Sequence, residues 1–280
     1  MAGIIRTARR PPGWIAPGPR PRGDEGRAEL QPADDEDLCF LTGEWRLFQK
    51  QRGHRWSLDD LVTAAVAAPH AEALGARTML DLGCGLGSVL LMMAWRFPGA
   101  DVTGIEAQAD RAAMGRRSIA WNGAEARCRI IDGDLRDPAT LPGGARFPLI
   151  TGTPPYFPEG TGPQSEKSHA AACRFETRGG IEDYALAAAR WLSPEGRFVV
   201  CTAALEADRV VAAAREAKLS IIEHVEVVPR EGKDVPVMID VMARNPGPLL
   251  RRGLTVRDAA SQWTPQFQAL REAMGFPPLR

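Results

Sequence analysis

The sequence predicts an α/β domain whose sheet is mostly parallel and ends in an antiparallel hairpin. Three observations favour this fold class. Strand-like and helix-like runs alternate from about residue 79 to residue 217, which is typical of strands connected through helices. The first of these strands leads directly into a glycine-rich turn at 83–87 and then into a second apolar run. Two β-rich runs, 219–228 and 235–243, are joined by a short turn that contains Gly232, and they predict a hairpin.

Composition sets the broad class of the protein. At 280 residues and 44% apolar content the chain can form one large domain with a sizeable core. Lys and Arg total 35, as do Asp and Glu, so the formal net charge is +0 and nucleic-acid contacts must come from a local basic patch. The five cysteines include no C-x-x-C pair, which argues against a zinc ribbon or a disulfide framework. No apolar run approaches the roughly 20 residues that cross a bilayer. We therefore expect a soluble protein of the reduced cytoplasm, and the sequence does not indicate its oligomeric state.

Residues 1–37 differ in composition from the rest of the chain. They hold many prolines, with arginines early and an acidic run late at 34–37. Such a segment buries too little apolar surface to offset its ordering entropy, so we expect a disordered tail over residues 1–37 and a folded domain over residues 38–280. Its arginines could contact RNA phosphates, although a solvated tail without a specific role is the simpler interpretation. A transit peptide also fits the acid-free start, but the prolines would interrupt its helix.

The turn Gly83-x-Gly85-x-Gly87 is the centre of the predicted site. Glycines let a ligand approach the backbone closely, and the helix that follows offers free N–H groups. The dinucleotide fingerprint G-x-G-x-x-G is absent, and Asp81 stands two residues before the first glycine. A second acid, Glu106, ends the next expected strand. This combination favours a nucleotide-binding turn over an unrelated glycine turn in which Glu106 only caps a helix.

This pattern resembles motif I of the class I S-adenosylmethionine-dependent methyltransferases. The resemblance implies a Rossmann-like sheet of seven strands and S-adenosylmethionine (S-adenosyl-L-methionine) as the cofactor. In that family the leading acid, here Asp81, lies near the amino-acid part of the cofactor, and the second acid, here Glu106, binds the ribose hydroxyls. The third expected strand leads to Asp134 and Leu135, which the resemblance places against the adenine, with Asp132 as the nearby competitor. Either of these last two acids is alternatively a plain turn residue.

The fourth expected strand, 147–152, is followed by Thr153-Pro154-Pro155-Tyr156. Two prolines at a strand end remove backbone donors and stiffen the chain, so that oxygen atoms can point into a pocket. The motif is similar to the Asn-Pro-Pro-Tyr motif of the bacterial adenine methyltransferases that modify tRNA for valine, and of their relatives. In that family the first side chain and the following carbonyl accept both hydrogens of the target amine, while an aromatic ring stacks on its plane. The resemblance implies Thr153, Pro154 and Tyr156 as catalytic residues, with Thr153 in place of Asn as a departure, because its hydroxyl is shorter and also donates.

The segments at either end of the expected domain extend this resemblance. Ser57 predicts a helix cap, with Asp59 and Asp60 in the first turn of a helix that runs to about Ala67. In the tRNA-modifying family, the acid that matches Asp59 lies beside the methionine end of the cofactor. The run 262–267 resembles the family's closing segment, which packs as a terminal helix.

Four further residues are expected to contact the substrate. Phe157 is a second candidate for stacking on the target base. Arg174 lies in the polar loop 159–178, which is expected to be a substrate lid or disordered. It is a candidate for a phosphate contact, with pairing to a nearby acid as an equal alternative. Arg230 and Lys233 lie at the expected hairpin tip, where the resemblance to RNA-binding members implies a basic surface.

Together these features predict a methyltransferase. The expected reaction is methyl transfer from S-adenosylmethionine to the exocyclic N6 amine of adenine in RNA, with tRNA as the expected RNA. No metal and no covalent intermediate is needed, because alignment of the amine with the methyl group supplies much of the rate. Two alternatives stay open. One is methylation of a protein glutamine or a small-molecule acceptor, and the other is a cofactor-binding module that lost catalysis together with the Asn.

Overall fold

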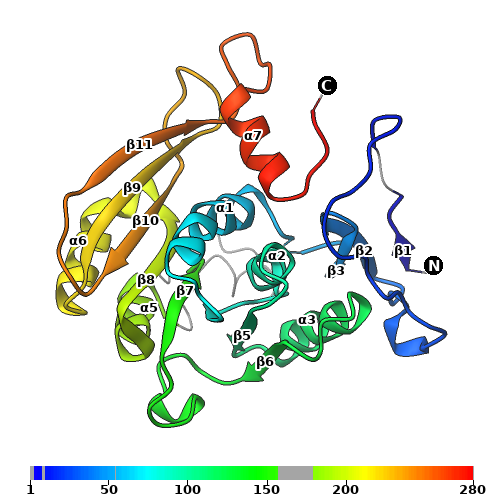
Figure 1. Ribbon diagram of the computed structural model, residues 1–280, viewed down its shortest axis with the longest axis horizontal. Helices are drawn as coiled ribbons and strands as arrows, with labels where there is room; N and C mark the ends of the chain where they lie inside the picture. The colour runs from blue at the N-terminus through cyan, green and yellow to red at the C-terminus, as the bar shows by residue number, and fades with distance from the viewer. Residues whose placement is uncertain (1–2, 8–9, 54, 157–178, 280) are drawn as a thin grey trace.

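An eight-stranded sheet runs through the centre of the structure, and helices cover both of its faces (Figure 1). The computed structural model describes residues 3–7, 10–53, 55–156 and 179–279. The strand order across the sheet is β11-β9-β10-β8-β7-β4-β5-β6. The strands are β4 (Thr78–Leu82), β5 (Asp101–Glu106), β6 (Cys128–Asp132), β7 (Phe147–Gly152), β8 (Leu192–Ala203), β9 (Ser220–Val228), β10 (Val237–Ala243) and β11 (Leu250–Thr255).

Neighbouring strands are parallel except where β10 pairs antiparallel with β8 and with β9. The predicted mostly parallel α/β sheet with a C-terminal antiparallel hairpin is therefore confirmed. The structure has one strand more than the seven expected, because β11 adds an edge beside β9. Residues Leu250, Arg251, Arg252 and Gly253 of β11 are exposed. The strand therefore lacks the alternation of apolar and polar residues by which a sequence reveals a strand.

The strand order reverses at β4. From β4 the chain proceeds to β5 and β6 on one side, and then returns to form β7 on the other side. A crevice opens beyond the carboxyl ends of parallel strands at such a reversal, and ligands bind there in open α/β sheets. The fold thus locates the candidate site before any side chain is considered.

Helices lie on both faces of the sheet. On one face α1, α2 and α3 pack against the sheet, and on the other α5 and α6 do, while α7 packs against β11. Among the described residues, no helix is long and apolar enough to span a membrane. The helices are α1 (Leu58–Ala73), α2 (Ser88–Arg96), α3 (Ala109–Trp121), α5 (Ile181–Trp191), α6 (Ala207–Glu216) and α7 (Pro265–Ala273), with 3₁₀ turns at Ala28–Leu30, Pro138–Thr140 and Ala204–Glu206.

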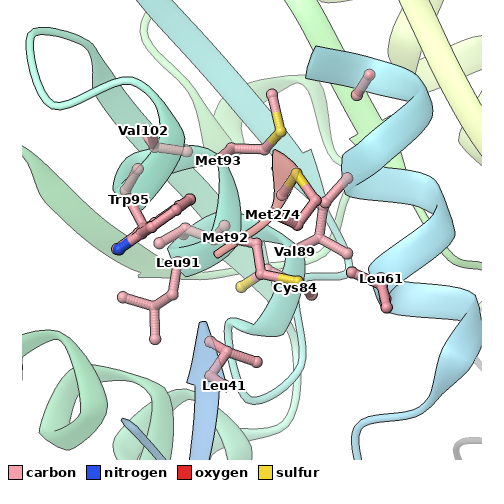
Figure 2. Packing of buried hydrophobic residues seen from close by; sticks show 14 of the residues in the cluster. Leu41, Leu61, Cys84, Val89, Leu91, Met92, Met93, Trp95, Val102 and Met274 are labelled. Carbon is pink, nitrogen blue, oxygen red and sulfur yellow. The ribbon is translucent and has the colours of Figure 1, made fainter. Parts of the chain in front are cut away.

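Helix α2 is enclosed on every side. All of its residues from Ser88 to Trp95 are buried, as expected for a helix that is apolar around its whole circumference. Figure 2 shows its side chains among Leu61 of α1, Leu41 and Met274, all members of one buried cluster. The helix is therefore a fixed part of the core, and the glycine turn before it has a rigid support.

Helix α1 begins where the sequence predicts and ends later. The Ser57 N–H donates to Asp60 Oδ2 at 2.8 Å, and Ser57 Oγ accepts from the Asp59 N–H at 3.4 Å. The helix continues to Ala73 rather than ending near Ala67, and it includes Pro69. Burial of its apolar face accounts for the continuation, because packing can outweigh the one hydrogen bond that a proline cannot donate.

The N-terminal segment packs against the domain. Here β1 (Ile4–Ile5) pairs parallel with β2 (Glu36–Thr42), which pairs antiparallel with β3 (Trp45–Lys50). Leu30 is 1% exposed. The described part of residues 1–37 therefore differs from the disordered tail that its composition predicts. The boundary at residue 37 is also late, because β2 already begins at Glu36.

Ion pairs explain why composition misses this packing. Arg6 and Arg55 both bond the buried Asp37, at 2.7 Å and 2.9 Å. Burial works against the ionised form, but the hydrogen bonds from Arg55 and Arg6 outweigh it and lower the pKa of Asp37. A carboxylate of the acidic run is therefore stabilised by arginines far from it in sequence, and charge content alone does not predict such pairs.

Candidate cofactor and acceptor site

A pocket of about 800 Å³, open to solvent, lies beyond the carboxyl ends of β4, β5, β6 and β7. Its size is in the range of small-molecule sites. The ends of these four strands and the starts of α1, α2 and α3 contribute to it, together with Gly179 and Tyr184 at the start of α5. The lining residues are Trp56, Asp60, Gly83, Cys84, Gly85, Leu86, Ser88, Ile105, Glu106, Ala107, Gln108, Arg111, Gly133, Asp134, Leu135, Thr153, Pro155, Gly179 and Tyr184.

The glycine turn forms one wall of the pocket. Gly83 and Gly85 have φ angles of +58° and +56°, which residues with a side chain rarely adopt. A Cβ on Gly83 would overlap the Tyr184 hydroxyl, and a Cβ on Gly85 would lie 2.5 Å from the Arg111 guanidinium. Gly87 is the left-handed N-cap of α2 and lies outside the lining. Both glycines are therefore required by conformation, and Gly83 is also required by space, because the Tyr184 ring leaves no room for a Cβ.

Glu106 ends β5 and projects its carboxylate into the pocket. Its side chain is held by two backbone donors, since the Gly85 N–H reaches Oε2 at 2.8 Å and the Gln108 N–H reaches Oε1 at 2.7 Å. The residue is only 5% exposed. Each carboxylate oxygen can accept a further hydrogen bond, so Glu106 fits the predicted role of binding a vicinal diol.

Asp81 lies beneath the pocket and does not line it. It accepts from the Thr151 hydroxyl at 2.7 Å and from the Leu90 N–H at 3.2 Å, and it is 3% exposed. It therefore joins β7 to the first turn of α2. In the structure Asp81 supports the turn from below, and its predicted position near the amino-acid part of the cofactor stays a prediction. Asp81 lies within β4, where its side chain is covered by the following helix.

The burial of Asp81 predicts a pH effect on stability. Burial raises its pKa to about 7 from 3.8, against the opposing hydrogen bond from Thr151. The folded state then binds this proton more tightly than the unfolded state. The free energy of unfolding should therefore fall as the pH rises from about 4 to about 7, by an amount of the order of 2 to 4 kcal/mol. Urea denaturation should show that the free energy of unfolding of Asp81→Asn falls less over this pH range than that of the wild type.

Asp101→Asn is the matched control for this prediction. Asp101 is exposed at the start of β5, the end of that strand away from the pocket. It should keep the wild-type slope of stability against pH. Equal slopes for wild type and Asp81→Asn would contradict the prediction.

Asp60, rather than Asp59, reaches the pocket. Asp60 lies at the third position of α1, where its carboxylate bonds back to the Ser57 N–H and accepts from the Ser88 hydroxyl at 2.8 Å. Burial raises its pKa despite these hydrogen bonds. Asp59 points instead to Tyr156, whose hydroxyl donates to Asp59 Oδ2 at 2.6 Å. The capping geometry decides which of the two acids faces the pocket, and neighbouring helix positions cannot both do so.

Of the two acids after β6, only Asp134 lines the pocket, together with Leu135. The Arg136 guanidinium pairs with Asp134 at 2.6 Å, and the Arg136 N–H donates to it at 2.9 Å. Asp132 instead pairs with Arg116. The structure thus favours Asp134 over Asp132 for the predicted adenine contact, and there the adenine amine must share the carboxylate with Arg136.

The Thr-Pro-Pro-Tyr motif leaves the end of β7 at the mouth of the pocket. Thr153 and Pro155 line it, and Pro154 is buried behind them. Tyr156 is outside the lining, and its hydroxyl lies 3.2 Å from Cys201 Sγ as well as bonding Asp59. The tyrosine therefore fastens the motif to the start of α1.

The remaining predicted substrate residues are more distant or undescribed. Phe157 and Arg174 lie outside the described residues. Arg230 and Lys233 are exposed on the loop between β9 and β10. This loop is at the same sheet edge as the pocket, because β10 begins opposite Ala203 at the end of β8. Strand spacing puts it about 10 to 15 Å from β7.

Sequence reasoning misses several side chains of the pocket, and three of them show why. Arg111 comes from the first turn of α3, and an arginine there looks like a solvated helix residue. Tyr184 comes from α5 on the other face of the sheet and looks like a core aromatic. Trp56 precedes the α1 cap and carries no signal of its own. Each enters through tertiary packing, which sequence spacing does not encode.

The pocket is rich in acceptors. Among the residues that the structure describes, the carboxylates of Asp60, Glu106 and Asp134 line it together with the Arg111 guanidinium. Leu86, Ile105 and Leu135 add apolar surface. Such a lining suits a cationic ligand that carries a diol, an ammonium and an aromatic amine, all of which donate hydrogen bonds. S-adenosylmethionine has these groups, so the residues present fit it.

Comparison with known proteins agrees with this chemistry. A family model described as a methyltransferase domain matches residues 79–161. A tRNA1(Val) (adenine(37)-N6)-methyltransferase of Porphyromonas gingivalis is 33% identical over 151 residues, 53% of this chain and 58% of the relative. The protein of that name from Actinobacillus pleuropneumoniae is 26% identical over 198 residues, 70% of this chain and 81% of the relative. A release factor glutamine methyltransferase of Geobacter sulfurreducens is 32% identical over 140 residues, 48% of this chain and 46% of the relative.

Among solved structures, a predicted O-methyltransferase from Agrobacterium tumefaciens matches with a TM-score of 0.59 at 20% identity, over 78% of this chain and 98% of that one. This likeness supports the fold alone. The chain therefore has the fold of the class I S-adenosylmethionine-dependent methyltransferases, and its residues 79–161 are similar to a methyltransferase domain. Within that class the chain is similar to the tRNA1(Val) (adenine(37)-N6)-methyltransferases, and it spans a little over half the length of the Porphyromonas relative.

Proposed function

We propose that the chain transfers a methyl group from S-adenosylmethionine to the exocyclic N6 amine of an adenine in RNA, with a tRNA as the expected acceptor and the cytoplasm as the expected compartment. The observation that carries this proposal is the position of Thr153 at the end of β7. It lines the same pocket as Glu106 and Asp60, so an amine held by Thr153 lies beside the cofactor site. The names of the relatives support adenine N6 as the acceptor.

Two oxygen acceptors at the motif suit an aromatic amine. S-adenosylmethionine supplies an electrophilic methyl group when bound. The Thr153 hydroxyl accepts one amine hydrogen and the Pro154 carbonyl accepts the other, which keeps the nitrogen lone pair directed at the methyl carbon. The same acceptors stabilise the positive charge that develops on the nitrogen. The target base must leave its stack to reach this position. Tyr156 is bonded to Asp59 outside the pocket lining, so of the two aromatic residues after the prolines Phe157 is the candidate to stack on the base.

Labelled methyl transfer tests this proposal. Wild-type protein should label total RNA and leave protein and small-molecule extracts unlabelled. Thr153→Ala removes one amine acceptor and should lower kcat on RNA by about 100-fold, while Thr153→Asn should retain activity. Thr78→Ala is the matched control, because Thr78 is exposed at the far end of β4.

Label found only in protein would favour a glutamine amide as the acceptor. Binding of the cofactor without transfer to any fraction would favour an inactive binding module. Either result would contradict the proposed RNA reaction.

A further inference from the structure

A second pocket adjoins the cofactor pocket. It contains about 720 Å³ of empty space and lies between the end of β2, the residue before the α1 cap and the segment after α7. Trp56 lines both pockets. The two sites therefore share a wall.

Two segments that lie far apart in sequence, the end of β2 and the residues after α7, meet at this second pocket. The Gly43 N–H donates to the Gly275 carbonyl at 3.0 Å, and the Thr42 hydroxyl donates to the Met274 carbonyl. In Figure 1 the red segment after α7 accordingly lies on the side of the domain that carries the blue N-terminal strands. These bonds hold the pocket in a defined shape without a ligand.

Aromatic rings form its walls. Phe40, Trp56 and Phe276 line the pocket, and each is only partly buried. The Trp56 and Phe276 rings are 6.0 Å apart between centroids and are tilted by 42°, so they are not stacked on each other. Partly exposed rings in a groove are the platforms on which proteins stack single-stranded bases.

One cation of the pocket has no acidic partner among the described residues. The Arg271 guanidinium lies 4.7 Å from the Phe276 ring centroid. Within the described part of the chain it forms no ion pair or side-chain hydrogen bond, and its Nε is buried. Arg10, on the other side of the pocket, is paired with Glu44 at 2.9 Å. A half-buried guanidinium that lacks an anion is a site where a phosphate is favoured.

We propose that this pocket binds one nucleotide of the substrate RNA next to the target adenine, with its base against Phe40 and Trp56 and its phosphate on Arg271. The inference rests on the proposed RNA reaction, because it assumes that the acceptor is part of a polynucleotide. It adds a second contact point beside the residue that precedes the α1 cap. A flipped base and a stacked neighbour would then be held on either side of Trp56.

Two substitutions test the subsite. Arg271→Gln removes the charge and Phe40→Leu removes one ring. On an RNA that the wild type methylates, each should raise the RNA Kd and KM by about tenfold and leave kcat and the Kd for S-adenosylmethionine unchanged. Arg271→Gln should also reduce the slope of the logarithm of the RNA-binding constant against the logarithm of the salt concentration by about 1, which corresponds to one lost phosphate contact. Arg271→Lys should recover part of the affinity. Arg215→Gln is the matched control, because Arg215 is exposed on α6.

The outcomes separate the subsite from the proposed function. If the wild type methylates RNA and both substitutions leave the RNA Kd unchanged, the subsite is wrong and the RNA reaction stands. If the variants also bind S-adenosylmethionine about tenfold more weakly, or melt at a clearly lower temperature than the wild type, these residues act through the fold. Either result would overturn the subsite. If the wild type neither binds nor methylates RNA, both proposals fail together.

Discussion

Glu106→Ala is expected to weaken binding of S-adenosylmethionine by about 100-fold or more. The carboxylate is the acceptor that the pocket offers to a diol, and two charge-assisted hydrogen bonds of roughly 1.5 kcal/mol each account for a change of that size. The substitution also releases the Gly85 and Gln108 N–H groups that Glu106 holds at 2.8 Å and 2.7 Å. Isothermal titration calorimetry with S-adenosylmethionine measures the effect directly.

Two companion variants sharpen this test. Glu106→Gln keeps one acceptor and should lie between wild type and Glu106→Ala. Glu216→Ala removes an exposed carboxylate from α6 and should bind as the wild type does. Cofactor affinity within threefold of wild type in a folded Glu106→Ala protein would contradict the assignment of the pocket.

Gly83→Ala is expected to lower the free energy of unfolding by about 2 to 5 kcal/mol. About 1 to 2 kcal/mol comes from placing a side chain at a φ of +58°. The rest comes from overlap of the new Cβ with the Tyr184 hydroxyl. The ring carbon Cζ that carries this hydroxyl would lie 2.9 Å from the Cβ. Urea denaturation with and without S-adenosylmethionine would measure both the stability and the loss of the cofactor's stabilising effect.

Gly75→Ala separates the two contributions. Gly75 has a φ of +56° and nothing within 4 Å of a Cβ, so alanine there is strained without a clash. It should therefore cost less than Gly83→Ala, and adding Tyr184→Phe to Gly83→Ala should recover part of the difference. Equal losses at Gly83 and Gly75 would show that close approach to Tyr184 plays no part.

The fold could be anticipated from the sequence because its main signals are local. Alternating strand and helix patterns require a mostly parallel sheet, and the turn around Gly232 requires a hairpin. The missed strand, β11, is exposed over most of its length and is ordered by pairing with β9. The contacts of the N-terminal segment could not be predicted for a similar reason. They depend on ion pairs that Arg6 and Arg55 form with Asp37 only in the folded chain.

The site could be anticipated at strand ends and less well elsewhere. Glu106 and Asp134 follow parallel strands, so topology alone brings their side chains to one edge. Neither the choice of Asp60 over Asp59 nor the burial of Asp81 beneath the turn is visible in sequence spacing, since each depends on where a helix lies. Tyr184 lies on α5, on the opposite face of the sheet, and its side chain reaches the pocket. No local sequence pattern predicts this contact.

The proposed reaction makes a chemically specific claim about its product. RNA methylated by the wild-type protein would be digested to nucleosides, and the labelled nucleoside identified by chromatography and mass spectrometry beside Thr153→Ala. The acceptor geometry at Thr153 and Pro154 predicts N6-methyladenosine, strongly reduced in the variant. Label on a ring nitrogen of adenine, on another base, or only on a protein amide would contradict methyl transfer to the exocyclic amine.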